Sequence, residues 1–318
     1  MDTTNTNERS LKTGASSFFC LPFHLAEFLC LAIGICLLCV LGGCKKPRET
    51  KTTGSIGPAI IPERIISLSP AGSEILCALG VFDHIVARTD FCNYPPEIKN
   101  KPSVGGFESK SISIETIISF EPQLVYGTAG IHDFLAPQLE QLGISVYLSR
   151  AHSVKSLLDE FVYLSKLVTG SEQNGLALAQ SVQSTFTLIQ HAAANAEPLR
   201  VYYEVWGSPF MSVGSRSYIN DIIQAAGGVN IFGDLDDEYP MVSEETIVAQ
   251  NPQVIIVPDM NGETKAGIAA RTGWQRIQAV QDGRIYFINA DIFSRPGPRI
   301  SEALSNIFEL LHPELAGE

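Results

Sequence analysis

The sequence predicts an α/β protein of two similar lobes, each with a central, mostly parallel sheet flanked by helices, bridged by one long helix. Short β-branched runs alternate with helical runs in both halves of the chain, as in βα units around parallel strands. Residues 113–126 (SIETIISFEPQLVY) and 243–256 (SEETIVAQNPQVII) repeat each other at a constant offset of 130. Residues 153–196, between the halves, have helical periodicity and almost no strand signal.

Length and composition allow two folded lobes and exclude one class of partner. The chain has 318 residues, of which 45% are hydrophobic and 18% charged, so it can bury a core and is not disordered. With a formal net charge of −12, the chain lacks the excess of Lys and Arg that nucleic-acid binding requires. An anionic membrane surface would also repel this charge. We therefore expect no nucleic-acid partner.

The first segment is interpreted as an export signal. Residues 28–44 (FLCLAIGICLLCVLGGC) are uncharged and fall short of the about 20 apolar residues that cross a bilayer, which favours a signal peptide. The end of this run, LGGC, resembles the bacterial lipoprotein signal, in which the cysteine, here Cys44, is acylated and becomes the N-terminus. The alternative is an uncleaved signal anchor. On the lipoprotein interpretation, residues 1–43 are the signal and residues 44–62 a lipid-anchored tether, and the protein faces the periplasm or the cell exterior.

Two cysteines then remain in the folded part, Cys77 and Cys92. In an exported protein such a pair either forms a disulfide, closing a loop of about 15 residues that contributes roughly 3 kcal/mol, or remains two small buried thiols. Both alternatives stay open, because sequence does not give the distance between the two Cα atoms.

The first lobe is assigned to residues 63–168. It opens with a β-branched strand at 64–69, which the residues from Pro70 onward interrupt. Ser73 suits the N-cap of the helix that follows, and Gly80 ends that helix. The remaining predicted elements are a helix at 113–120, a strand at 123–126, a helix at 134–143 and a strand at 145–148.

The bridge is assigned to residues 169–197. Gly170 and Ser171 divide the helical stretch into a first helix and a longer one at about 172–195. A long helix between lobes permits little hinge motion, in contrast to extended linkers. The second lobe is assigned to residues 198–318. Its predicted elements are a strand at 200–206, a helix at 218–226 that stops at Gly227 and Gly228, a strand at 284–289 and a last helix at about 300–311.

No motif for catalysis or metal binding stands out. The chain has no Walker loop, no Gly-x-Gly-x-x-Gly after the first strand and no Gly-x-Ser-x-Gly elbow. The five histidines beyond the signal are scattered singly, without metal-ligand spacing. His132 follows a predicted strand end, where α/β sheets bind ligands, but a solvated loop histidine is the favoured interpretation. We expect no enzymatic activity, no metal and no cofactor.

Loops of both lobes hold aromatic and polar side chains. They are Phe91 and Phe107 in the first lobe, and Trp206, Tyr239, Asp291 and Arg295 in the second. An aromatic loop residue most often covers the edge of a core. Gathered from two lobes, these residues would suit a cleft for a large, flat, partly polar ligand, because aromatic faces supply area and a few polar groups supply orientation.

The chain resembles a known family over about residues 63–312. This family comprises the substrate-binding proteins of ABC importers for metal chelates, and the resemblance is greatest to its cobalamin-binding members. The similar segments are RIISLSPAGSEILCALG, NYPPEI, ETIISFEPQLVYG, QLGISVY, AAGGVNIF, YPMVSEETIVAQNPQVII and DIFSRPGPRI. The resemblance implies the class III periplasmic binding protein fold, a monomer, and a permease with its ATPase subunits as partner. The implied ligand is cobalamin or a related corrinoid, with haem or a ferric siderophore as the alternative.

The resemblance also implies roles for the cleft residues. Ligand-stacking aromatic positions are occupied by Phe91, Phe107 and Tyr239. Asp291 and Arg295 match polar groups that meet the corrin side chains, and Trp206 lies in the corresponding loop without a clean match. Arg295 is the one clear cation among these residues, which disfavours an anionic siderophore. An interpretation from a different class, a metal-dependent enzyme or scaffold, would need clustered Cys or His.

The repeat places one glutamate at the same position in each lobe, Glu115 and Glu245. Both follow a serine that suits an N-cap, so they could simply favour the positive end of a helix, an effect of about 0.3–1 kcal/mol. The resemblance implies a second role, in which the two carboxylates dock onto arginines of the permease. We favour docking, because exposed charges suit steering and orientation.

Overall fold

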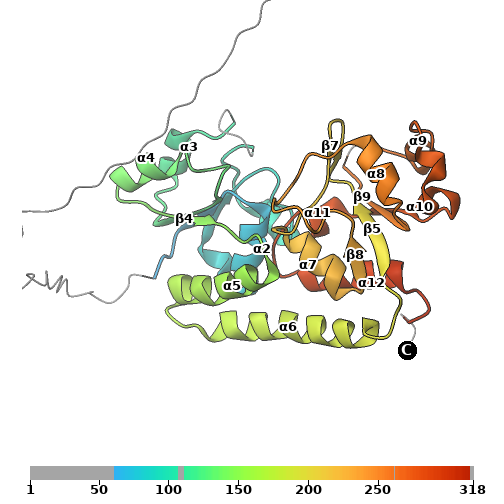
Figure 1. Cartoon of the computed structure of the whole chain (residues 1–318). Coiled ribbons are helices and arrows are strands. Elements are labelled where there is room, and N and C mark those ends of the chain that lie inside the picture. Colours follow the sequence, from blue (N-terminus) through green and yellow to red (C-terminus); the bar gives the residue numbers. More distant parts are fainter. Residues whose placement is uncertain (1–60, 107–110, 261, 316–318) are drawn as a thin grey trace, which may run out of the picture. The chain divides into compact units, whose positions relative to one another are not determined.

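The computed structural model describes residues 61–106, 111–260 and 262–315, which belong to one compact unit (Figure 1). The predicted signal peptide, Cys44 and Phe107 lie outside the described residues. Within these ranges, no helix combines the length and the apolar character needed to cross a membrane.

The first lobe is built on a four-stranded parallel sheet in the order β2-β1-β3-β4. Its strands are β1 (Ile65–Ser67), β2 (Ile85–Arg88), β3 (Leu124–Thr128) and β4 (Ser145–Ser149). Its helices are α2 (Pro70–Ala78), α3 (Ile114–Ser119) and α4 (Ala136–Gln141), with 3-10 turns at Phe82–His84 and Pro96–Asn100. Ile65 and Ile66 belong to different core clusters, as expected when both faces of a parallel sheet are covered.

The first helix begins earlier than the sequence predicts. Ser69 is its N-cap and Pro70 its first residue, whereas Ser73 lies inside the helix and donates a buried hydrogen bond to Ser67 Oγ (3.0 Å). Proline suits the first helical position because its φ is already helical and no N–H is needed there. The predicted end is confirmed, since Gly80 follows the helix with a φ of 87°.

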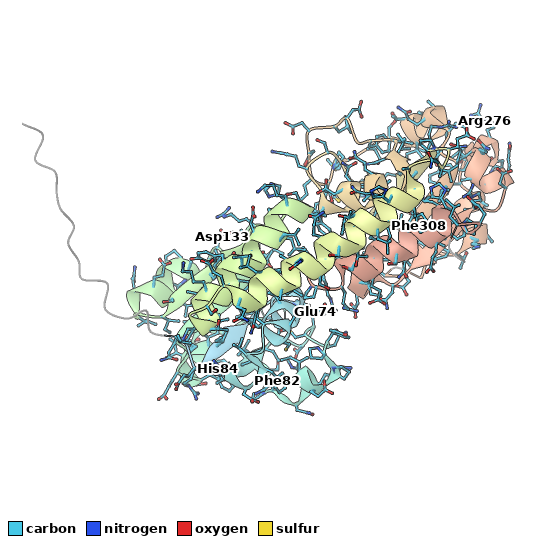
Figure 2. All side chains as sticks on the ribbon, turned by 90° about the horizontal axis from the view of Figure 1, so that it is seen from below. Glu74, Phe82, His84, Asp133, Arg276 and Phe308 are labelled. Atoms are coloured by element: carbon cyan, nitrogen blue, oxygen red, sulfur yellow. The ribbon has the colours of Figure 1, made fainter. Side chains whose placement is uncertain are left out.

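The bridge assigned to residues 169–197 corresponds to α6 (Gln173–Ala193), and α5 (Val154–Thr169) precedes it and packs against it. The predicted division at Gly170 is confirmed: this residue ends α5 in the left-handed conformation, with a φ of 75°. The two helices approach closely at Gly175, where a Cβ would lie 2.3 Å from the carbonyl oxygen of Phe161. Figure 1 shows α6 running beneath both lobes, and Figure 2 gives the view from below.

The second lobe repeats the architecture of the first with a parallel sheet in the order β10-β9-β5-β8. Its strands are β5 (Leu199–Tyr203), β8 (Gly228–Asn230), β9 (Val254–Pro258) and β10 (Ile285–Ile288). Its helices are α7 (Tyr218–Ala225), α8 (Glu244–Gln250), α9 (Lys265–Ala269), α10 (Gln278–Gln281), α11 (Ala290–Phe293) and α12 (Ile300–Leu311), with a 3-10 turn at Trp274–Arg276. The sequence predicts that Trp206 ends the first strand of this lobe. In the structure, Trp206 lies instead in a separate antiparallel hairpin of β6 (Trp206–Gly207) and β7 (Phe210–Met211).

The sequence repeat corresponds to a structural repeat. In the two copies, Ser113 and Ser243 cap α3 and α8, and each hydroxyl accepts the amide hydrogen of the threonine three residues on, at 3.2 Å. The strands that follow, β3 and β9, are both interior strands of their sheets. The prediction of two similar lobes with parallel sheets is therefore confirmed.

One hydrophobic core cluster spans both lobes, and each lobe has one further cluster of its own. A single cluster of buried side chains includes Leu76 and Phe161 of the first lobe, Phe186 of the bridge helix α6, and Ile222 and Leu304 of the second lobe. The division into domains at residues 168 and 197 stays a prediction, because this core crosses both positions. A continuous core opposes wide rotation of one lobe against the other.

Candidate functional site

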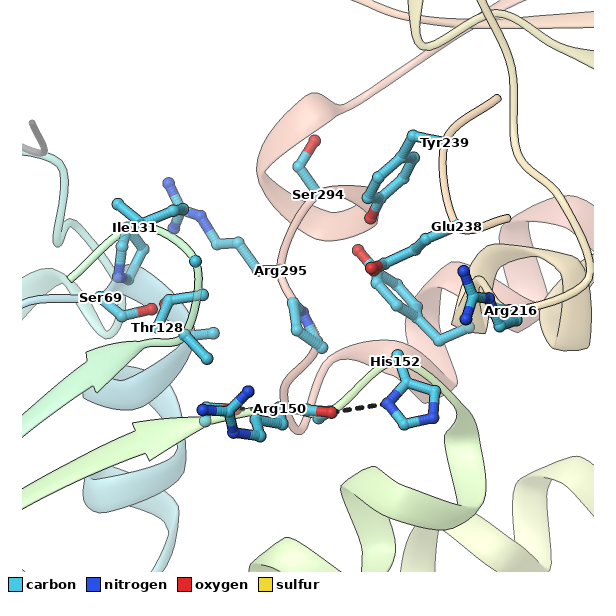
Figure 3. A pocket seen from close by; sticks show the side chains of 18 of the residues that line it. Ser69, Thr128, Ile131, Arg150, His152, Arg216, Glu238, Tyr239, Ser294 and Arg295 are labelled. Atoms are coloured by element: carbon cyan, nitrogen blue, oxygen red, sulfur yellow. Dashed lines mark hydrogen bonds between the residues drawn. The ribbon is translucent and has the colours of Figure 1, made fainter. Parts of the chain in front are cut away.

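A cavity of about 980 Å3 lies between the two lobes, where the carboxyl ends of several strands meet (Figure 3). From the first lobe, it is lined by Ser69, Pro70, Ala71, Phe91, Tyr126, Thr128, Ala129, Gly130, Ile131, Ser149, Arg150, Ala151 and His152. From the second lobe, it is lined by Arg216, Tyr218, Asp237, Glu238, Tyr239, Met260, Ser294, Arg295 and Pro296. Its volume lies at the upper end of the range for small-molecule sites, about 300–1,000 Å3.

The structure brings three of the predicted ligand-binding residues together in this cavity. Phe91 and Tyr239 face it from opposite lobes and are 56% and 36% exposed, and Arg295 contributes from the second lobe. Trp206 and Asp291 are not among its lining residues. Trp206 instead donates from Nε1 to the carbonyl oxygen of Ser208 (2.9 Å) on its own hairpin.

Arg295 belongs to a group of polar side chains that joins the lobes and in which Glu74 and Arg295 are buried. We call this group the inter-lobe ion cluster: Glu74, Asn93, Asp291, Arg295 and Arg299. The Arg295 guanidinium donates to Glu74 Oε1 (3.2 Å), Asn93 Oδ1 (2.7 Å) and Asp291 Oδ1 (2.5 Å). Asn93 also donates to Asp291 Oδ2 (2.8 Å). Asp291, predicted to meet the ligand, thus contacts Arg295 and Asn93.

Glu74 is the centre of the inter-lobe ion cluster. This first-lobe carboxylate is buried, and Arg299 of the second lobe donates to both of its oxygens, from Nε (2.8 Å) and Nη2 (2.6 Å). The hydrogen bond to Glu74 raises the pKa of Arg299, against the effect of desolvation. The same guanidinium lies over the ring of Tyr94, 4.2 Å from its centroid. Two arginines of one lobe therefore hold a single acid of the other.

Sequence reasoning missed two further arginines. Arg150 follows β4 directly and Arg216 precedes the N-cap of α7, and both line the cavity. Arg295 is the one clear cation among the predicted cleft residues, and the cavity adds these two arginines, which were not predicted. A signal was present for Arg150, because side chains that follow the carboxyl end of a parallel strand tend to reach the ligand site.

A buried carboxyl group lies behind two of the residues that line the cavity. Tyr126 and Ser149, which line the cavity, donate to the two oxygens of Glu160 on α5, each at 2.7 Å. Burial raises the pKa of Glu160, and the two hydrogen bonds act in the opposite direction. Glu160 thus positions two lining residues without itself reaching the cavity.

The Glu160→Gln variant is expected to fold and to alter the pH dependence of stability. Because the pKa of Glu160 lies above its usual value of 4.5 in the folded chain, the folded state holds this proton more tightly than the unfolded state. The stability of the wild type relative to the variant should therefore be greatest below pH 4.5 and fall as the pH rises through the folded pKa. Urea denaturation of both proteins across this range measures the difference, and a difference that stays flat or grows with pH contradicts the assignment.

The structure changes the interpretation of one histidine and decides between the two alternatives left open for the cysteines. His132 is fully buried rather than solvated, and its Nδ1 accepts the amide hydrogen of Thr128 (2.9 Å). Cys77 and Cys92 are free thiols rather than a disulfide. Burial raises the pKa of Cys77 to about 11, so that its reactive thiolate is scarce at neutral pH. No group of three potential metal ligands occurs among the described residues.

Glu115 and Glu245 lie apart from the cavity lining, one in each lobe, and both are exposed. The hydroxyl of Ser113 donates to Glu115 Oε2 (2.7 Å) and lowers the pKa of this carboxyl. The pKa of Glu245 is also lowered, first by a hydrogen bond with its own backbone and then by Ser243. Both side chains thus present stable negative charges at the start of a short helix.

Comparison with known protein sequences gives consistent matches. A family model described as periplasmic binding protein matches residues 65–292. The vitamin B12-binding protein of Vibrio cholerae serotype O1 is 30% identical over 247 residues, which cover 77% of this chain and 87% of that protein. An uncharacterized ABC transporter substrate-binding lipoprotein of Bacillus subtilis is 28% identical over 261 residues, 80% of this chain and 81% of that protein.

Solved structures agree with the fold. The crystal structure of the periplasmic vitamin B12 binding protein BtuF of Vibrio cholerae has a TM-score of 0.66 at 27% identity and covers 81% of this chain and 99% of that one. The periplasmic heme-binding protein RhuT from Roseiflexus has a TM-score of 0.70 at 24% identity, and the match covers 79% of this chain and 98% of that one. At that identity the likeness to RhuT concerns the fold alone.

Proposed function

Because this chain belongs to the periplasmic binding protein family, we propose that it captures cobalamin or a related corrinoid between its lobes and delivers it to the permease of an ABC importer. The family consists of solute-binding proteins of transport systems, not of enzymes, and works outside the cytoplasm. The chain has the fold of a class III periplasmic binding protein.

The cavity is the observation that carries the corrinoid proposal. A corrin is a broad, flat macrocycle edged with amide side chains, so it needs a large opening, aromatic area and few polar anchors. Phe91 and Tyr239 offer aromatic faces from opposite lobes of a cavity of about 980 Å3. The 30% identity to a vitamin B12-binding protein supports the same ligand class. Phe107, at a predicted stacking position, stays part of the proposal.

Haem is the second candidate ligand, because Tyr239 and His152 in the cavity are side chains that could coordinate its iron. Coordination by tyrosine requires the phenolate. Burial raises the pKa of Tyr239, and neighbouring Glu238 raises it further, so the ligand-free protein keeps this phenol protonated, and haem iron would have to displace the proton to bind through Tyr239.

The N-terminal segment supports a lipid-anchored protein. An uncharged run ending in LGGC at Cys44 has the length of a signal peptide rather than a membrane span. The Bacillus subtilis relative is named as a lipoprotein. We place the acylated Cys44 at the membrane surface, with residues up to 62 as the tether.

Calorimetric titration of the purified full-length chain with cyanocobalamin, haem and a ferric hydroxamate siderophore tests the ligand class. Micromolar or tighter binding of cyanocobalamin, with weaker binding of the other two, is the expected result. Calorimetry is preferable to fluorescence, because Trp274 is fully buried and Trp206 is not among the residues that line the cavity. Binding of haem or the siderophore without cyanocobalamin would replace the corrinoid proposal.

A further inference from the structure

Two arginines reach the cavity from different lobes. Arg150 comes from the loop after β4 in the first lobe, and Arg216 from the loop before α7 in the second (Figure 3). A guanidinium presents several N–H donors in one plane, which match the oxygens of a phosphate or carboxylate. The cavity thus contains hydrogen-bond donors for an acidic group of a ligand, which the aromatic side chains alone could not bind.

Both guanidinium groups can exchange their present partners for a ligand at little cost. Arg150 lies 3.9 Å from Asp133 and Arg216 lies 3.5 Å from Asp236, and the two arginine side chains are 75% and 59% exposed. Exposed ion pairs of this kind contribute about 0–1 kcal/mol. Arg295 differs, because it is 9% exposed and its donors already serve Glu74, Asn93 and Asp291.

The cavity also contains two carboxyl groups, Asp237 and Glu238, which adjoin the arginine of the second lobe in the lining. Desolvation raises the pKa of Glu238, and the charges of His152 and Arg216 act in the opposite direction. Once Arg295 is counted as neutralised by the inter-lobe ion cluster, two arginines face two acids. Such a lining suits a ligand with one acidic group and no net charge better than a dianion.

We propose that Arg150 and Arg216 form a subsite for the phosphodiester of the bound corrinoid. This inference rests on the proposed function and adds a specificity determinant to it. Cyanocobalamin has one phosphodiester, balanced by the positive charge of its metal centre, and therefore no net charge. Haem has two carboxylates, and so adds two negative charges to a lining in which the two arginines already face Asp237 and Glu238. The subsite therefore selects a complete cobalamin over haem and over a corrinoid that lacks the nucleotide loop.

The test compares the full-length wild type with the double variant Arg150→Gln/Arg216→Gln by calorimetric titration. The ligands are cyanocobalamin, cyano-cobinamide and haem; cobinamide keeps the corrin ring and its amides but lacks the phosphodiester and the nucleotide. The double variant should bind cyanocobalamin on the order of tenfold more weakly, the effect of losing charge-assisted hydrogen bonds, and bind cobinamide unchanged within about twofold. Arg276→Gln removes an exposed arginine that does not line the cavity and is the matched control.

The outcomes separate this inference from the function on which it rests. A loss confined to cyanocobalamin supports the subsite. Unchanged cyanocobalamin affinity, or an equal loss for cobinamide, overturns the subsite and leaves corrinoid binding standing. A wild type that binds haem and no corrinoid overturns both. Equal melting temperatures of the double variant and the Arg276→Gln control show that any loss of affinity does not come from unfolding.

Discussion

The Glu74→Gln variant is expected to lose about 3–5 kcal/mol of unfolding free energy, the typical result of removing one partner from a buried ion pair. Glu74 is buried on α2 and accepts hydrogen bonds from Arg295 and Arg299 of the other lobe. Neutralising it leaves Arg299 without its carboxylate partner and Arg295 with the ion pair to Asp291 alone. Guanidinium chloride denaturation, followed by circular dichroism, measures the change.

The matched control removes an acid from an exposed ion pair. Asp159→Asn breaks the contact of Asp159 with Lys155 (2.6 Å), whose side chains are 68% and 86% exposed, and should change stability by less than about 0.5 kcal/mol. If Glu74→Gln costs no more than this control, the inter-lobe ion cluster does not stabilise the contact between the lobes.

Reversing the charge of both lobe glutamates, in the variant Glu115→Lys/Glu245→Lys, is expected to reduce cobalamin uptake by cells at least about tenfold. Like charges brought together at an interface cost several kcal/mol, and each 1.4 kcal/mol is about tenfold in binding. Ligand affinity of the purified variant should remain that of the wild type, because neither residue lines the cavity. Uptake of radiolabelled cobalamin and calorimetry of the purified protein measure the two effects.

The control for this variant is Glu140→Lys/Glu309→Lys, which makes the same change in charge at one exposed position in each lobe. It should transport cobalamin normally if Glu115 and Glu245 dock at specific sites. If cells with the Glu115→Lys/Glu245→Lys variant still take up cobalamin normally, these carboxylates only stabilise the ends of their helices. Equal losses in both variants would point to net charge rather than to docking.

The predicted stability loss of Glu74→Gln and the predicted uptake loss of Glu115→Lys/Glu245→Lys both depend on a rigid connection between the lobes. Docking through two carboxylates on separate lobes requires a constant spacing between them. The core that continues through both lobes and the bridge, together with the inter-lobe ion cluster, maintains that spacing. Lobe closure around the ligand is therefore expected to be slight, and the exposed rim of the cavity, including Phe91, can adjust instead.

Local pattern was sufficient to predict most of the elements. The repeat identified α3 with β3 and α8 with β9, and Gly170 marked the break between α5 and the bridge helix α6. Errors arose where a short signal was ambiguous. Ser73 resembled an N-cap, but Pro70 could already begin the helix, and the four-residue strand Ile85–Arg88 was missed because it follows a single 3-10 turn rather than a long helix.

The sequence by itself determined the α/β class, the two related lobes, the helical bridge and the family, because periodicity, caps and turn residues depend on near neighbours in the chain. Only the tertiary structure decided which polar side chains meet. Arg295 lines the cavity, but its pairing with Glu74 joins residues 221 positions apart. Likewise, Arg150 and Arg216 became neighbours of one cavity only when both lobes packed on the shared core. The charge of a site depends on which ions burial brings together, and that is a property of the packed molecule.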